Sequence, residues 1–316
     1  MDFVGKNDLF CQNDHRLIEQ KIIEFILYLK KEGKSFAAIH NYVASIKSFY
    51  KINDVMLNDR KISKFMPEHT RLRKDRAYTY DEISKLLDIA DERMRVVILL
   101  LASTGIRIGA ITSLKLRNLE DNKIVVYENT NQEYFTFITP ECKKAIDFYI
   151  DMRSRYGEKI NDDSYLIREQ FDIRDQFAIK KPKQITHRSI EWKLISLAER
   201  CGIRKREHEI EGRKNSSIRK DVAIAHGFRK FFTTQLINSK VNPEIREMLL
   251  GHKIGLASCY YRPTQEDMYI EYEKAIDNLT IDPANRLQRK VETLTVEKSI
   301  LDSIASRLQE LEKKIE

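Results

Sequence analysis

Apolar side chains recur at the spacing of amphipathic helices at both ends of the chain, and this pattern favours a mainly helical fold. Near the start, a stripe of isoleucine, leucine and phenylalanine runs over 15–33 and ends at Gly33. Ser35 suits the N-cap of a second helix, and 54–66 has room for one or two short ones. Only 10 glycines and 6 prolines occur in 316 residues, so few long loops are expected. Residues 1–68 therefore predict a small all-helical domain.

The C-terminal segment, 285–316, carries a second kind of helical pattern. Its heptad positions are Leu287, Leu294, Leu301, Leu308 and Ile315. Further apolar residues lie three or four positions from these, as at the a and d positions of a coiled coil. The pattern predicts a long helix that packs either on its own domain or against a second subunit.

Two short segments interrupt the helical pattern and predict a β-hairpin. KIVVYE (123–128) and EYFTFIT (133–139) are rich in β-branched and aromatic residues, and NTNQ between them supplies the turn. A helix should begin after Thr79, where Glu82 completes a capping box. Further helices are expected over 188–200, 228–239 and 243–250, and a polar exposed loop over 201–220. Residues 79–284 thus predict a mixed α+β domain in a chain that is mainly α.

The charge distribution suits a polyanionic partner. The net charge is +8 and the pI is about 9.1, which fits nucleic acid but does not by itself identify it. Between the two domains, 69–78 is polar and lacks hydrophobic periodicity. Its cations, Arg71, Arg73, Lys74 and Arg76, are candidates for contacts along DNA phosphates, and a solvated linker is the alternative.

The four cysteines are far apart and have no metal-ligand spacing, which predicts reduced thiols and no structural zinc. The N-terminus lacks the features of a signal peptide, and the longest apolar run, VVILLLA, is too short to span a bilayer. A soluble, cytoplasmic protein with no membrane partner is expected.

Four short motifs carry the candidate chemistry: TGIRIGAITSLKLRNL, HGFRKFFTTQL, LLGH and YYRP. Their candidate site residues are Arg107, His226, Arg229, His252 and the adjacent Tyr260 and Tyr261. His226 and Arg229 are three residues apart and share a helical face, and the first turn of a helix favours anions. Each motif alone is common, but their order and separation in a basic helical chain are specific.

This series of motifs resembles the tyrosine recombinase family of phage-type integrases. The four motifs look like its T-G-x-R-x-G-E box, its H-x-x-R, its L-G-H and its nucleophile segment, and the 26 residues from His226 to His252 match its usual separation. The resemblance covers about 75–280 and implies that 1–68 is a core-binding domain that clamps DNA. The ending YYRPTQEDMYIEYEKAIDNLTI looks like archaeal integrases, which implies an archaeal mobile element or virus.

The resemblance also implies the chemistry. A tyrosine attacks a DNA phosphodiester to give a covalent 3′-phosphotyrosyl intermediate, and strands are rejoined without a metal, ATP or any other cofactor. Arg107 and Arg229 would clamp the phosphate oxygens, while His226 and His252 would donate hydrogen bonds or help take the phenol proton. The implied partners are double-stranded DNA attachment sites and further copies of the chain, four on synapsed DNA in the nucleoid.

Two departures from the family pattern concern the site. The glutamate of the first box is replaced by Ala110, and the hairpin tip ENTNQ lacks the lysine that is thought to protonate the leaving 5′-oxygen. Lys123, at the start of the first strand, is the candidate replacement. The alternatives are another cation such as Lys143, or slow cleavage without a replacement.

The spacing leaves the nucleophile open between two tyrosines. Tyr261 lies nine residues after His252, which is the commonest spacing in the family. Family nucleophiles are also often followed, two positions later, by a basic residue. That second pattern selects Tyr260, because Arg262 lies two positions after it. We favour Tyr260, with Arg262 as a DNA contact.

Three other functions fit parts of the pattern. A catalytically impaired relative that only binds DNA, as a regulator or architectural protein, predicts specific binding with no covalent adduct. A type IB topoisomerase would relax any plasmid regardless of sequence. A basic helical scaffold would have no role on DNA.

Overall fold

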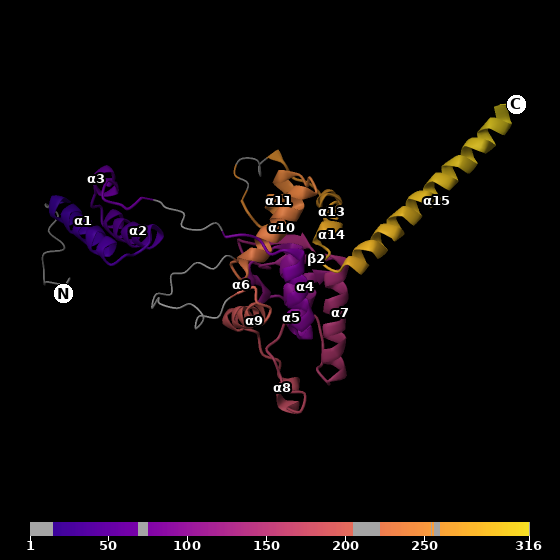
Figure 1. Ribbon diagram of the computed structural model, residues 1–316, viewed down its shortest axis with the longest axis horizontal. Helices are drawn as coiled ribbons and strands as arrows, with labels where there is room; N and C mark the ends of the chain where they lie inside the picture. Colours follow the sequence, from indigo (N-terminus) through magenta and orange to yellow (C-terminus); the bar gives the residue numbers. More distant parts are fainter. Residues whose placement is uncertain (1–14, 69–74, 205–221, 254, 256–259, 316) are drawn as a thin grey trace. The chain divides into compact units, whose positions relative to one another are not determined.

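The computed structural model describes residues 15–68, 75–204, 222–253, 255 and 260–315, with side chains as far as Arg307 (Figure 1). The chain is mainly helical, as predicted, and divides into two compact units, Met1–Lys74 and Asp75–Glu316. The finer division predicted from the sequence, with a linker over 69–78 and a separate tail from 285, stays a prediction. Within the described ranges, every helix is too short or too polar to cross a bilayer.

The first unit is a small helical bundle. It contains α1 (His15–Lys31), α2 (Phe36–Ile52) and α3 (Asp59–Ser63) around a core of isoleucine, leucine and valine. The hydroxyl of Ser35 accepts a hydrogen bond from the amide of Ala38, which confirms the predicted N-cap. The buried Glu19 accepts hydrogen bonds from the Asn58 amide and Lys61 Nζ, which joins α1 to α3.

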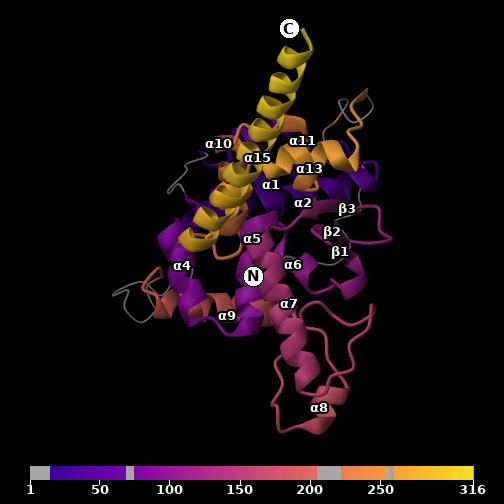
Figure 2. The same ribbon diagram turned by 90° about the vertical axis from the view of Figure 1, so that its right-hand side faces the viewer.

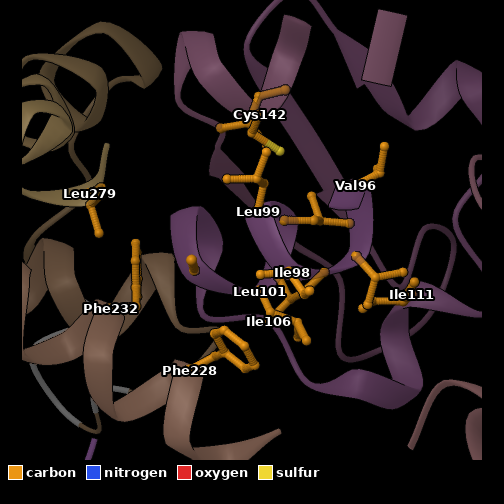
Figure 3. Close-up of a cluster of buried hydrophobic side chains, with 14 of the residues drawn as sticks. Val96, Ile98, Leu99, Leu101, Ile106, Ile111, Cys142, Phe228, Phe232 and Leu279 are labelled. Carbon is orange, nitrogen blue, oxygen red and sulfur yellow. The ribbon is translucent and has the colours of Figure 1, made fainter. Parts of the chain in front are cut away.

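The second unit is built around α5 (Glu92–Thr104), in which every residue from Arg93 to Thr104 except Arg95 is buried. The helices that pack against it include α4 (Tyr80–Ile89), α7 (Pro140–Arg155), α9 (His187–Arg200), α10 (His226–Asn238) and α14 (Ile276–Leu279). The apolar run VVILLLA therefore forms the centre of a helical core. Figure 3 shows Phe228 and Phe232 of α10 facing side chains of α5 such as Ile98 and Leu101.

A three-stranded antiparallel sheet lies in the second unit, in the order β1-β2-β3. Its strands are β1 (Leu119–Glu120), β2 (Lys123–Val126) and β3 (Tyr134–Phe137). The hairpin formed by β2 and β3 was predicted, but β1 was not, because two residues are too few to show a strand pattern. The register pairs Lys123 with Phe137 and Val126 with Tyr134. Lys123 therefore lies at the end of the hairpin opposite its tip.

Among the described residues, the second unit also contains α6 (Ile108–Ile111), the 3₁₀ helix η1 (Leu116–Asn118), α8 (Gln176–Lys180), α11 (Pro243–Leu249), α13 (Gln265–Glu273) and α15 (Pro283–Ile315). The capping box of Thr79 and Glu82 is confirmed at the start of α4. The polar loop predicted over 201–220 lies mostly outside the described residues.

The long C-terminal helix is confirmed as α15, the yellow helix of Figure 2. Its first turns are attached to the second unit, since Arg289 pairs with Asp277 at 3.0 Å and Arg286 donates to the carbonyl of Thr280. Further along, its apolar seam is exposed, with Leu294 at 60% and Leu301 at 65% of full exposure. The described residues therefore leave the predicted seam uncovered.

A buried cluster of charges fixes the segment that follows α7. The carboxylate of Glu158 is fully buried and binds Arg153 at 2.5 Å and Arg168 at 2.7 Å. The two guanidinium groups, themselves buried, also donate to backbone carbonyls of Tyr165 and Ala178. One buried carboxylate thus connects α7, the following loop and α8.

Removing that carboxylate should strongly destabilise the second unit. In Glu158→Gln, two buried guanidinium groups lose their counter-charge, and breaking such a buried network costs about 3–5 kcal/mol of unfolding free energy. The measurement is urea unfolding at pH 7. Asp163→Asn is the matched control, because Asp163 pairs with Arg117 at an exposed site, and its midpoint should barely move. Equal midpoints for the two variants would contradict the expectation.

The same cluster predicts a pH dependence. Burial raises the pKa of Glu158, but the hydrogen bonds from Arg153 and Arg168 outweigh it and lower the pKa below its ordinary value. The stabilisation is therefore fully present above the unfolded-state pKa of about 4.3 and is lost as the pH falls through the lower folded-state pKa. The unfolding free energy of the Glu158→Gln variant should therefore lack the fall with decreasing pH that Glu158 causes in the wild-type protein.

Candidate active site

A cavity of about 350 Å³ lies in the second unit, between α10, the end of α11 and the turn that follows. It is lined by Ala77, His226, Arg229, Lys230, Thr233, Thr234, Glu247, Leu250 and His252. Three of the residues predicted from the motifs therefore share one cavity. Seven of these nine residues have polar or charged side chains, and an arginine and a lysine among them can bind a phosphate.

The periodicity of α10 explains how its residues reach the cavity. Positions 226, 229, 230 and 233 share one face of a helix, while the opposite face buries Phe228 and Phe232 in the core. The helix begins at His226, two residues earlier than predicted. His226 therefore occupies the first turn, where the amides of Gly227 and Phe228 donate to the carbonyls of Ala223 and Ala225.

Arg229 is the most constrained side chain in the cavity and is 8% exposed. Its Nη1 donates to the Gly105 carbonyl at 2.8 Å, and Nη2 contacts the Leu250 carbonyl and His252 Nε2, both at 2.7 Å. These contacts use three of the five N–H groups of the guanidinium, and the phenol of Tyr134 lies within hydrogen-bonding reach of the same group. Burial lowers the pKa of Arg229, and the charge of Arg107 lowers it further.

Gly105 makes this arrangement possible. It is the left-handed C-cap of α5, with φ of 61°, a conformation that favours glycine. A Cβ atom there would lie 2.5 Å from the Phe232 ring. Because Gly105 has no side chain, the backbone of the TGIR motif can pack closely against α10. This close approach places the Gly105 carbonyl next to Arg229.

His252 is held on both sides. Its Nδ1 lies 2.6 Å from Glu247 Oε2, and its Nε2 lies 2.7 Å from Arg229. Because arginine can only donate, we assign the proton to Nδ1, which then donates to Glu247. The hydrogen bond from His252 lowers the pKa of Glu247. In this tautomer Nε2 is the acceptor of the ring, and it accepts a hydrogen bond from Arg229.

Arg107 precedes α6 and has an exposed side chain. Its charge and that of Arg229 both act on the phenol of Tyr134, so the two arginines converge at the start of β3. Burial raises the pKa of Tyr134 to about 12, and the two arginines oppose that shift. Tyr134 and Glu247 were missed in the sequence. The sequence feature that could have indicated Tyr134 is its position as the first aromatic residue of the predicted strand EYFTFIT.

The structure does not bring Lys123 to the cavity. Its ammonium lies 2.5 Å from Glu120 and 3.2 Å from Gln265. Lys143 pairs with Asp147 on the outer face of α7. Ala110, which replaces the family glutamate, is fully buried in the core. The lysine that lines the cavity is Lys230, and it pairs with Asp75 at 2.7 Å.

The two candidate nucleophiles differ in exposure, at 90% for Tyr260 and 37% for Tyr261. Within the described residues, neither phenol lines the cavity or forms a hydrogen bond, and residues 256–259 lie outside the description. Arg262 is exposed beside them.

The predicted DNA-contacting linker is described only at its end. Arg76 forms a two-pronged ion pair with Glu82, at 2.7 and 2.6 Å. Arg71, Arg73 and Lys74 lie outside the described residues.

Known proteins share this sequence pattern. The model of the phage integrase family matches residues 76–266, which is well over half of the chain. The tyrosine recombinase XerC of Lactobacillus leichmannii is 22% identical over 269 residues, covering 78% of this chain and 80% of the relative. The tyrosine recombinase XerA of Thermococcus onnurineus is 22% identical over 272 residues, covering 84% and 85%.

Solved structures share the fold. The integrase of the Tn1549 transposon, in complex with circular intermediate DNA, aligns with a TM-score of 0.52 and 22% identity over 80% of this chain and 84% of that chain. A lambda integrase dimer bound to a COC′ core site aligns with a TM-score of 0.50 and 16% identity, over 78% and 80%. With the family model matching residues 76–266, the protein belongs to the phage integrase family of tyrosine recombinases.

Proposed function

We propose that this recombinase acts on specific DNA sites, which it cleaves and rejoins through a covalent 3′-phosphotyrosyl intermediate without metal or ATP. The observation that carries the proposal is the chain of contacts from Glu247 through His252 to Arg229, with Arg107 converging on the same place. Duplex DNA is the expected substrate, because the structures with this fold include integrases in complex with DNA.

Each group in the site has a role in the proposed reaction. The phenol oxygen of Tyr260, or alternatively Tyr261, attacks the phosphorus, and the 5′-oxygen leaves as the phosphotyrosyl bond forms. Arg107 and the N–H groups of Arg229 that the protein leaves free bind the non-bridging oxygens, where negative charge grows in the transition state.

The two histidines and a lysine complete the proposal. His252 Nε2 takes the phenol proton once the His252 ring moves off Arg229, which stays bound to the Gly105 and Leu250 carbonyls. His226 contributes a hydrogen bond from the first turn of α10. Lys123 remains a candidate donor to the leaving oxygen, provided that its pairing with Glu120 breaks on DNA.

We further propose that Arg76, Arg262 and the cations at 71, 73 and 74 contact DNA phosphates and that four protomers assemble on two synapsed sites. The exposed seam of α15 supports contacts between protomers. Binding to DNA should weaken steeply with salt, because phosphate contacts release counterions.

Covalent trapping tests the proposal directly. The protein is incubated, with a chelator present, with a nicked duplex from the junctions of the element that encodes it, labelled at the 5′ end of the scissile strand. A labelled adduct that survives denaturation is the expected result. Specific binding without an adduct would favour the catalytically impaired relative, and relaxation of plasmids of any sequence would favour a topoisomerase.

A further inference from the structure

The hydroxyl of Tyr134 is buried, and none of the described residues accepts its proton. The guanidinium of Arg229 lies within hydrogen-bonding reach of the phenol oxygen, but arginine can only donate. Leaving a buried donor unpaired carries a cost, and native proteins rarely retain one without a reason. This hydroxyl belongs to the same phenol on which the charges of Arg107 and Arg229 converge. An unpaired donor at this place indicates a ligand acceptor that the free protein does not supply.

The ring of Tyr134 is held in position by the turn before His252. Gly251 has a left-handed φ of 66°, and a Cβ atom there would lie 2.5 Å from the Tyr134 ring. On the other side, β3 pairs Tyr134 with Val126 at the start of the hairpin tip. The phenol is therefore fixed between the hairpin and the turn that carries His252.

The hairpin brings this tyrosine, and not a lysine, to the arginines. Lys123 lies three residues along β2 from Val126, and three residues of strand span about 10 Å. Its ammonium is also occupied by Glu120, while the ammonium of Lys230 is occupied by Asp75. Among these neighbouring donors, the hydroxyl of Tyr134 is the one without an acceptor in the described structure.

We propose that the Tyr134 hydroxyl donates a hydrogen bond to a non-bridging oxygen of the scissile phosphate, as a third donor beside Arg107 and Arg229. The proposal rests on the function proposed above. No proton is transferred, since the O–H bond stays intact throughout. The donor is available at neutral pH because burial keeps the phenol protonated, with its pKa raised to about 12.

The decisive variant is Tyr134→Phe, which removes only the oxygen. Because no described residue accepts the proton of this hydroxyl, the midpoint of thermal unfolding should stay close to that of the wild-type protein. Single-turnover cleavage of the nicked duplex should slow by about 10²-fold, as for loss of one transition-state donor elsewhere. Tyr127→Phe is the matched control, with its ring centroid 6.4 Å from that of Tyr134, and should cleave at the wild-type rate. A wild-type rate in Tyr134→Phe would overturn the proposal.

A second substrate separates two roles of a donor. In a duplex with sulfur in place of the bridging 5′-oxygen, the leaving group is a thiolate, which needs no proton. A variant that lacks only the proton donor to the leaving group should therefore cleave this duplex at the wild-type rate. Tyr134→Phe should remain slow on this substrate. Full recovery would place the hydroxyl at the leaving group and overturn its assignment to a non-bridging oxygen.

A third measurement does not depend on cleavage. Inorganic phosphate should raise the thermal midpoint of the wild-type protein and of Tyr127→Phe more than that of Tyr134→Phe. Equal shifts would overturn the inference. If the wild-type protein forms no adduct but these shifts differ, the proposed recombination fails while the phosphate contact of Tyr134 stands.

Discussion

A Tyr260→Phe variant is expected to bind attachment-site duplex as well as the wild-type protein and to form no covalent adduct. The reason is chemical, since the phenol oxygen becomes one of the two bridging ester oxygens of the phosphotyrosyl intermediate and phenylalanine has no oxygen to supply. The substitution should leave stability unchanged, because the Tyr260 side chain is 90% exposed and the described residues give its hydroxyl no partner. The measurements are a gel-shift titration and the denaturing gel of the trapping assay.

Tyr261→Phe is the matched control, since it removes the same atom one residue away. It should retain the adduct. If the adduct is lost in Tyr261→Phe and kept in Tyr260→Phe, the nucleophile lies one residue later than we favour. An adduct in both variants, and also in the double variant, would exclude this pair of tyrosines.

An Arg229→Lys variant should lose activity and stability together, although its formal charge is unchanged. Lysine has a single ammonium, so it cannot reproduce the forked contacts to Gly105, Leu250 and His252. Cleavage should fall by roughly 10³-fold, at the upper end for loss of one donor to a developing oxyanion. The unfolding free energy should fall by about 1–3 kcal/mol for each buried carbonyl left unpaired.

Single-turnover cleavage and urea unfolding measure the two effects separately. Arg155→Lys is the control, because its ion pair with Asp151 is exposed, and both quantities should match the wild type. An Arg229→Lys protein that cleaves at the wild-type rate would show that position 229 acts only as a positive charge.

Local rules predicted much of the fold. The cap at Ser35, the capping box at Thr79 and the hairpin over 123–139 each depend on residues close together in the chain, and all three are confirmed. His226 and Arg229 were placed on one face because helical periodicity alone requires it. Fold class followed from these elements and from the scarcity of glycine and proline.

The site itself depends on contacts between distant parts of the chain, which local patterns do not reveal. Tyr134 meets Gly251 across more than a hundred residues, and only the register of the hairpin shows that it, rather than Lys123, lies on the side of the arginines. Glu247 was missed for a different reason, since its contact with His252 depends on how α11 ends. Such contacts follow from packing rather than from propensity.

The backbone carbonyls that hold Arg229 have a consequence for the rate of recombination. A free arginine side chain carries about 2 kcal/mol of rotamer entropy, and a site that had to order it on DNA would lose that amount from its binding energy. Here, Gly105 and Leu250 fix the guanidinium plane during folding. The entropic cost is therefore met before the substrate arrives, and the energy of binding DNA remains available to bring the tyrosine to the phosphate.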